Sequence, residues 1–198
     1  MYGSTIWNRT GVTKKMSLLE EKTIKTEQIF TGKIISLQVD DVELPNGKTA
    51  KRELIKHPGA VAIIPVTTEN KIVMVEQFRK ALERNIVEIP AGKLEKGEQP
   101  RASALRELEE ETGYECETLE LVTSFYTSPG FADEIVHVYE ARGLTKKENP
   151  AAQDEDEFIN LIELTLDEAL EYVAEQKIYD AKTIFAVQYL QLKEALNR

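Results

Sequence analysis

The chain has 198 residues, 41% hydrophobic and 30% charged, which is enough for one globular domain with a real core but a poor fit to two. Its net charge of -10 argues against a nucleic-acid backbone as the main partner, because like charges repel. The one sustained apolar run, residues 61–66, is far shorter than the roughly 20 residues of a membrane span. We therefore expect neither nucleic acid nor membrane as a partner.

Cysteine usage and the N-terminus bear on the compartment. Cys116 is the only cysteine, which excludes an intrachain disulfide and indicates a reducing, cytoplasmic environment. The N-terminus lacks an apolar core followed by a cleavage site, so no secretory signal is expected. Residues 1–15 are polar and lack periodicity, and they precede a second methionine, Met16. We expect a disordered extension there or sequence upstream of the true start, with a short ordered arm as the alternative.

An N-terminal β region is predicted over residues 16–57. Residues 33–44 and 49–57 both alternate between apolar and polar side chains, and they flank a turn centred on Asn46-Gly47. This pattern predicts an antiparallel hairpin, which Pro58-Gly59 ends. The rest of the chain, residues 58–198, is expected to form the main domain.

In the main domain, residues 60–66 form a continuous apolar run, as expected of a strand buried on both faces. Thr165 and Glu168 form a capping box that begins a helix. A long acidic loop is expected over residues 143–156. Further strands are predicted at 71–78, 86–89, 119–126, 134–141 and 157–164, and helices at 100–112, 165–176 and 180–196. Mixed strands with helices between and after them predict an α/β or α+β fold with a mixed sheet.

The helix at residues 100–112 carries the clearest chemical signal. Ala104, Leu105 and Leu108 are spaced for one buried face, and Gly113 is a natural helix stop. Three glutamates, at 107, 110 and 111, project from one side, whereas Glu109 points elsewhere. Like charges at this spacing destabilise a helix, so the side is either a solvated acidic face or a cation site. Carboxylates suit hard cations such as Mg²⁺ or Mn²⁺.

The context of these glutamates decides between the two. The sequence matches the Nudix box at every fixed position. Gly92 is followed after five residues by Glu98, and after seven more by the run 106–114 (RELEEETGY). Average residue usage would produce this by chance in on the order of one chain in a million. The chain thus resembles the Nudix hydrolase family. The resemblance implies an α/β/α sandwich with a mixed sheet, preceded here by the N-terminal hairpin, and Mg²⁺-dependent hydrolysis of a nucleoside diphosphate linked to another group, with Mn²⁺ able to substitute.

The resemblance also implies metal ligands. Glu107 and Glu111 are the leading ligands, Glu110 ligates or supports them, and Glu98 lies on a loop that reaches the same cations. The carbonyl of Ala91 is a further ligand. Arg106 can hold a neighbouring glutamate by a charged hydrogen bond, so Arg106 and Glu110 are counted as catalytic as well. Bound cations would also offset the negative charge of the chain, which otherwise repels a diphosphate.

The substrate is suggested by segments outside the box. Pro129, in the sequence Ser-Pro-Gly-Phe, lies at an offset that resembles the ADP-ribose pyrophosphatase branch of the family, as do residues 76–79, 87–92 and 155–158. The resemblance covers roughly residues 30–195 and implies hydrolysis of ADP-ribose to AMP and ribose 5-phosphate. The residues it implies for substrate binding are Arg52 and Glu53 near the adenine, Arg79 at a phosphate, and Glu88, Pro129, Gly130 and Phe131. For the base that activates water it implies Glu157, with Glu155 as its rival.

Several of these residues also have a structural alternative. Arg79 can be a surface arginine, Arg52 and Glu53 a cross-strand pair, and the acidic loop a solubilising segment. Phe131 can stack on a base or pack the loop. For the whole protein, the alternatives are hydrolysis of another nucleoside diphosphate sugar and a module that senses ADP-ribose without cleaving it. By resemblance, a homodimer that pairs through the N-terminal β region is expected.

Overall fold

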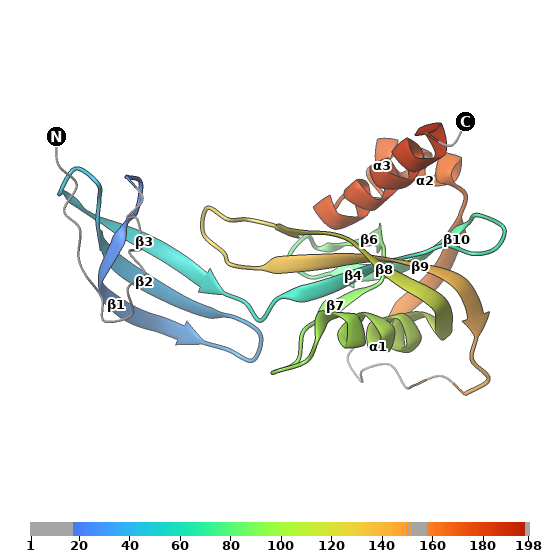
Figure 1. Ribbon diagram of the computed structural model, residues 1–198, viewed down its shortest axis with the longest axis horizontal. Helices are drawn as coiled ribbons and strands as arrows, with labels where there is room; N and C mark the ends of the chain where they lie inside the picture. The colour runs from blue at the N-terminus through green and yellow to red at the C-terminus, as the bar shows by residue number, and fades with distance from the viewer. Residues whose placement is uncertain (1–17, 150, 152–157, 197–198) are drawn as a thin grey trace, which may run out of the picture. The chain divides into compact units, whose positions relative to one another are not determined.

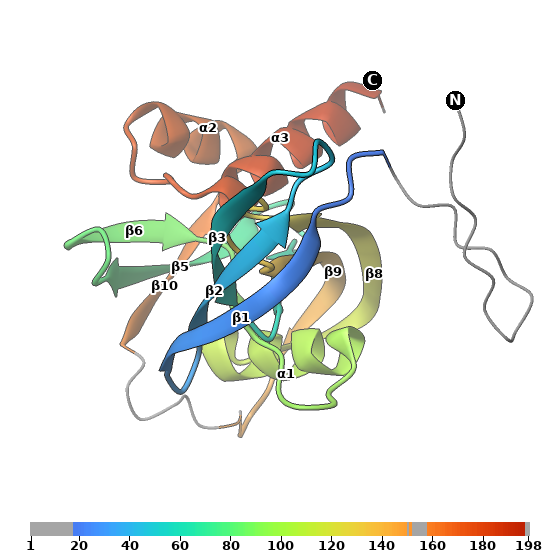
Figure 2. The same ribbon diagram turned by 90° about the vertical axis from the view of Figure 1, so that its left-hand side faces the viewer.

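The computed structural model describes residues 18–149, 151 and 158–196, and the chain divides into two units, the first ending at Lys56 and the second beginning at His57. The first unit is an antiparallel sheet in which β2 (Ser36–Glu43) lies between β1 (Lys22–Thr31) and β3 (Thr49–Lys56) (Figure 2). The predicted hairpin is confirmed as β2 and β3, which pair from Ser36 opposite Lys56 to Glu43 opposite Thr49. At the turn, Gly47 adopts a φ of 78°, which glycine tolerates without strain.

Strand β1 has no counterpart among the predicted elements. All ten of its residues are exposed, including the apolar side chains of Ile24, Ile29 and Phe30. Sequence patterns reveal a strand through the contrast between a buried and a solvated face, and this strand has no buried face. It is also an edge strand, so one side of its backbone has no neighbour in the described sheet.

The second unit contains two sheets. The larger is mixed and has the order β7-β4-β9-β8; β4 runs parallel to β9, and the other neighbours are antiparallel. The smaller is antiparallel and has the order β10-β5-β6. Their strands are β4 (Ala60–Pro65), β5 (Ile72–Arg79), β6 (Arg84–Glu88), β7 (Ala91–Lys93), β8 (Tyr114–Tyr126), β9 (Ile135–Lys146) and β10 (Ile159–Leu164).

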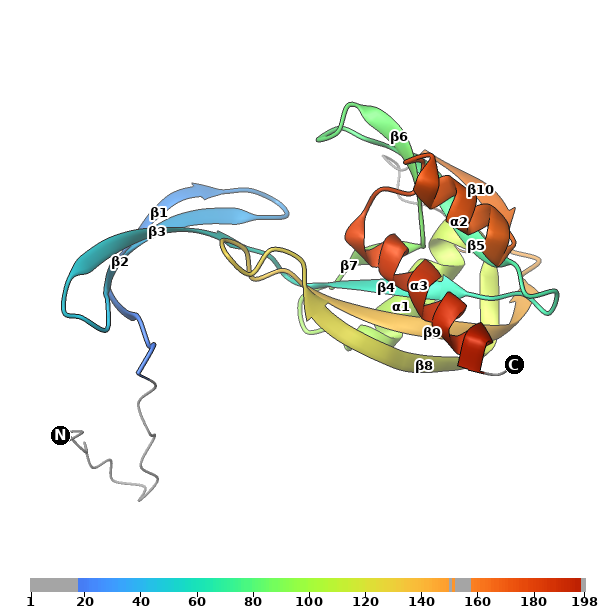
Figure 3. The same cartoon turned by 90° about the horizontal axis from the view of Figure 1, so that it is seen from above.

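The apolar run of β4 is buried on both faces, as predicted. Val61 and Ile63 point to a core that includes Leu108 of α1 (Pro100–Thr112). Ala62 and Ile64 point to the opposite core, to which α2 (Leu166–Ala174) and α3 (Ala181–Leu196) contribute. Figures 1 and 3 show α1 on one side of β4 and β9 and the other two helices on the opposite side. The expected α/β/α sandwich with a mixed sheet is confirmed.

The ends of the helices follow local sequence rules. Pro100 begins α1, where its missing N–H costs nothing, and Gly113 ends it with a φ of 72° and an N–H bond to the Glu109 carbonyl. Both ends of α1 match the prediction. The capping box at Thr165 and Glu168 is also confirmed. Among the described residues, no helix is long and apolar enough to cross a membrane.

Three expectations were wrong in detail. Leu105 was expected on the buried face of α1, yet it is 37% exposed, because that face is formed by residues 103, 104, 107, 108, 111 and 112 and Leu105 lies beside it. Strand β8 begins at Tyr114 rather than near Leu119, and β9 continues to Lys146, because Tyr114 pairs with Lys146. The predicted loop at 143–156 therefore begins after Lys146.

Truncation of Leu108 should destabilise the fold far more than truncation of Leu105 on the same helix. Leu108 is fully buried, so Leu108→Ala should lower the free energy of unfolding by about 2–5 kcal/mol in urea titrations. The exposed Leu105 provides the matched control, and Leu105→Ala should cost less than about 1 kcal/mol. Equal losses for the two variants would contradict the packing described for α1.

Candidate active site on helix α1

The box helix turns two of its glutamates inward. Glu107 and Glu111 are both buried, on the side of α1 that also buries Ala104 and Leu108. Buried carboxylates are costly unless they are paired or hydrogen-bonded. Glu111 accepts a hydrogen bond of 3.0 Å from the backbone N–H of Ala91, at the start of β7. Strand β7 thus holds the Glu111 carboxylate through its backbone.

Gly92 leaves the space that Glu107 occupies. It pairs with Val61 in the sheet, and a Cβ atom added to it would overlap the Glu107 carboxylate. Its φ is not positive, so the need for glycine here comes from close approach and not from backbone conformation. The first fixed position of the box is therefore a cradle for one of the predicted metal ligands.

Arg106 joins three carboxylates. Its Nη1 donates to Glu107 and to Glu110, each at 2.8 Å. Its Nε and Nη2 donate to the two oxygens of Glu98, each at 3.1 Å. The hydrogen bond from Arg106 is the largest cause that lowers the pKa of Glu98 to about 2, and Glu98 is in turn the largest cause that raises the pKa of Arg106. Glu98 and Arg106 are therefore both charged near neutral pH.

The cluster fits a hard divalent cation in its chemistry. Glu98, Glu107, Glu110 and Glu111 supply four negative charges against the one positive charge of Arg106, which leaves three in excess. Carboxylate oxygens are the preferred ligands of Mg²⁺ and Mn²⁺. Within the described part of the chain, however, no three His, Cys, Asp or Glu side chains are arranged as a ready cage. Arg106 bonds one oxygen of Glu107, Oε1, so a cation at that oxygen would compete with the guanidinium.

The fourth glutamate of the helix points elsewhere, as predicted. Glu109 pairs with Lys147 at 2.8 Å and accepts from the backbone N–H of Ala151 at 3.1 Å. Glu109 makes no bond to Arg106 in the described structure, so it is not part of the acidic side of α1.

Arg79 lies beside this site. It ends β5, and its Nε donates to buried Glu88 at the end of β6 over 2.6 Å. Burial lowers the pKa of Arg79, but the Glu88 hydrogen bond and the nearby charges of Glu88, Glu111 and Asp180 outweigh burial and raise it. Arg79 is thus a cation within electrostatic range of Glu111, one of the two inward carboxylates. Sequence analysis missed the second cation on Glu88, which is Lys182 of α3.

The other predicted site residues belong to the first unit, to the β8–β9 loop or to the part of the chain outside the described residues. In the first unit, Arg52 forms a double hydrogen bond with Glu21, and Glu53 is its neighbour in β3, so the two side chains point to opposite faces of that sheet. In the β8–β9 loop, Ser128 accepts from the N–H groups of Phe131 and Ala132, and Phe131 is 54% exposed. That exposure argues against a packing role for Phe131. The predicted base Glu157 and its rival Glu155 lie outside the described residues.

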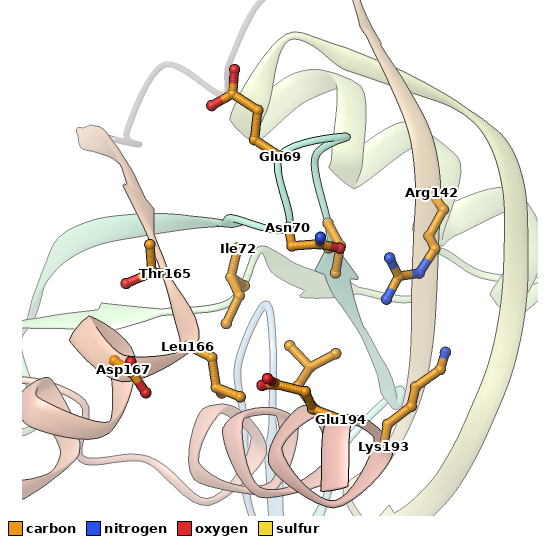
Figure 4. A pocket seen from close by; sticks show the side chains of 11 residues that line it. Glu69, Asn70, Ile72, Arg142, Thr165, Leu166, Asp167, Lys193 and Glu194 are labelled. Carbon is orange, nitrogen blue, oxygen red and sulfur yellow. The ribbon is translucent and has the colours of Figure 1, made fainter. Parts of the chain in front are cut away.

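A separate pocket of 560 Å³ opens at the other end of β4. In Figure 4, Arg142 of β9 and Lys193 of α3 lie on the same side of this hollow. Both bond to buried Glu140, and Lys193 reaches it at 2.6 Å. No residue of the Nudix box lines the pocket, whose lining is Val66, Glu69, Asn70, Ile72, Arg142, Thr165, Leu166, Asp167, Leu190, Lys193 and Glu194.

Comparison with known families accounts for this arrangement. The Nudix domain model matches residues 56–185, and a model described as the nucleoside diphosphate sugar hydrolase N-terminal domain matches residues 21–55. A solved structure described as an ADP compounds hydrolase shares the fold with a TM-score of 0.78 at 19% identity, covering 92% of this chain and 97% of that one. The chain therefore belongs to the Nudix family.

Two curated relatives are similar over nearly their whole length. The methanol dehydrogenase activator of Bacillus methanolicus is 74% identical over 180 residues, which cover 91% of this chain and 97% of the relative. The ADP-ribose pyrophosphatase of Bacillus subtilis is 65% identical over 182 residues, which cover 92% of this chain and 98% of the relative. These identities and coverages show which members of the family the chain is similar to.

Replacement of Gly92 by alanine should weaken metal binding without unfolding the protein. The added Cβ displaces the Glu107 carboxylate, the end of a flexible side chain, so the melting temperature should change little. The affinity for Mn²⁺, measured by calorimetric titration, should fall at least about tenfold.

Gly130→Ala is the matched control, because a Cβ at Gly130 meets open space. This variant should bind Mn²⁺ as the wild type does. Wild-type affinity for Mn²⁺ in Gly92→Ala would refute the role assigned to the cradle.

Proposed function

We propose that this protein hydrolyses the diphosphate linkage of ADP-ribose to AMP and ribose 5-phosphate, with Mg²⁺ as its cofactor and Mn²⁺ as a substitute. The observation that carries the proposal is the complete box, in which Gly92 cradles Glu107 and the Ala91 N–H holds Glu111. The 65% identity with the Bacillus subtilis ADP-ribose pyrophosphatase supports the choice of substrate.

The reaction requires a water oxygen to bond to one phosphorus while the bridging P–O bond breaks and the bridging oxygen leaves with the other phosphate. Glu107 and Glu111 would hold the metal, with Glu98, Glu110 and the Ala91 carbonyl around them. Bound there, a divalent cation neutralises phosphate charge and lowers the pKa of water. Arg106 keeps Glu98, Glu107 and Glu110 gathered, and its hydrogen bonds lower the pKa of Glu98. The proton of the attacking water is assigned to Glu157, with Glu155 as the alternative.

Substrate contacts are assigned to residues around this centre. Arg79 is assigned to a phosphate, since its side chain is 39% exposed and lies in the field of Glu111. Glu88 is buried with both oxygens bonded to cations, which favours support of Arg79 over direct contact with substrate. Pro129, Gly130 and exposed Phe131 are assigned to the sugar or base, and Arg52 and Glu53 to the adenine.

A second candidate function follows from the Bacillus methanolicus relative, whose 74% identity favours activation of a methanol dehydrogenase. Hydrolysis of another nucleoside diphosphate sugar remains the alternative within the same chemistry, and the N-terminal domain match supports it. A sensing module that binds without cleavage is disfavoured because all the box glutamates are present. The single cysteine supports a cytoplasmic location.

A direct assay distinguishes these functions. Purified protein with Mg²⁺ should convert ADP-ribose to AMP and ribose 5-phosphate, and EDTA should abolish the conversion. Glu111→Gln should lose at least about a hundredfold in kcat/KM, because a metal ligand is lost while the side chain keeps its shape. Glu109→Gln on the same helix is the control and should retain wild-type activity, since Glu109 bonds to Lys147.

Each alternative has its own outcome in this assay. If the protein cleaves another nucleotide sugar but not ADP-ribose, the proposed substrate is wrong and the proposed enzyme class is right. Tight binding of ADP-ribose without cleavage would establish a sensor. Stimulation of a methanol dehydrogenase by the wild type, but not by Glu111→Gln, would tie activation to the same site.

We also propose that the protein is a homodimer that pairs through the first unit. Strand β1 presents an unpaired edge in the described sheet and exposes Ile24, Ile29 and Phe30. Light scattering should give twice the monomer mass of 22.5 kDa. Ile29→Lys places a charge on this face and should shift the mass toward the monomer, whereas a monomeric wild type would refute the proposal.

A further inference from the structure

Buried Glu88 is bonded by two cationic side chains that lie far apart in the sequence, Arg79 and Lys182. Arg79 of β5 donates through Nε to Oε2, and Lys182 of α3 donates to Oε1. Lys182 also bonds to Asp180 at 2.9 Å. With Asp180 included, two positive and two negative charges balance in this cluster. A buried carboxylate with both oxygens occupied has little freedom to move.

The cluster is tied to the strand that carries the active site. Thr183 follows Lys182 in α3, and its hydroxyl accepts a hydrogen bond of 3.1 Å from the N–H of Ile89. Ile89 lies two residues before Ala91, whose N–H holds the carboxylate of Glu111. The beginning of α3 therefore fixes both Glu88 and the backbone that leads into β7.

Arg79 gives only part of its guanidinium to Glu88. Its Nε makes the bond, while Nη1 and Nη2 make no hydrogen bond to any residue of the described ranges. A guanidinium and a free carboxylate prefer two parallel hydrogen bonds. Here the second oxygen of Glu88 is already bonded to Lys182, so that arrangement is blocked. The unused edge of Arg79 stays available in the field of Glu111.

We propose that Lys182 is a positioning residue of the substrate site: by occupying Oε1 of Glu88 it keeps Nη1 and Nη2 of Arg79 free to bind the substrate diphosphate. The inference rests on the proposed function, because it assigns Arg79 to a phosphate. Without Lys182, both oxygens of Glu88 bond Arg79. The edge of Arg79 that would bind phosphate is then no longer free. Lys182 itself touches no substrate.

The kinetic test uses Lys182→Met. Because Arg79 binds the diphosphate in the ground state as well as the transition state, KM for ADP-ribose should rise about tenfold while kcat changes less than about threefold. The control is Lys193→Met. Lys193 lies on the same helix and bonds buried Glu140, so its loss costs comparable stability, but the pair lies at the separate pocket. Lys193→Met should leave KM unchanged.

A binding measurement separates this inference from the proposed substrate. The dissociation constant of pyrophosphate with Mg²⁺, measured by calorimetry, should also rise about tenfold in Lys182→Met and not in Lys193→Met. If the wild type fails to cleave ADP-ribose but this difference appears, the substrate proposal fails and the positioning role stands.

Equal KM and equal pyrophosphate affinity in the two variants would overturn the inference. The Lys182–Glu88 pair would then serve only to hold α3 against β6. If Lys182→Met does not fold, Lys182→Gln, compared with Lys193→Gln, replaces it. Its neutral amide competes weakly for Oε1, so pyrophosphate affinity should fall at least about threefold. A smaller difference from Lys193→Gln would overturn the inference in the same way.

Discussion

The arrangement of the whole site depends on three carboxylates held around the Arg106 guanidinium and a fourth, that of Glu111, held by a backbone N–H. Glu107 and Glu111 are buried with the same charge on one helix, which costs free energy in proportion to their burial. Arg106 offsets part of that cost by bonding Glu98, Glu107 and Glu110 together, and the Ala91 N–H offsets another part at Glu111. The remaining excess of negative charge supports the proposal that the site binds a divalent cation.

The sandwich architecture supplies the rigidity that this cluster requires. Strand β4 is covered on both faces, with Ile63 packed toward α1 and Ile64 packed toward the core of α3. Strand β7 pairs with β4, so the cradle at Gly92 and the helix that fills it are anchored to the same buried strand. On the opposite side, α3 reaches the site through Lys182 and Thr183. Both layers of helices therefore help to define one centre.

Much of the centre could be predicted from sequence because its signals are local. Pro100 and Gly113 mark the ends of α1, and the spacing of the box glutamates fixes which of them share a side. Strand β1 could not be predicted, since an exposed strand leaves no pattern of burial. The Lys182–Glu88 pair also could not, since 94 residues separate its members and a lysine in a helix is ordinary. That Arg106 bonds Glu98, Glu107 and Glu110 at once appears only in the geometry.

The position at which a divalent cation binds is the most direct test of the proposed site. Crystals soaked in Mn²⁺ and measured by anomalous diffraction should show manganese bonded to carboxylate oxygens of Glu107 and Glu111, beside the Ala91 carbonyl. The bond between Arg106 and Glu107 should be loosened in that structure, while the bonds from Arg106 to Glu98 persist. Manganese bound elsewhere, with Glu107 still fully paired to Arg106, would contradict the account.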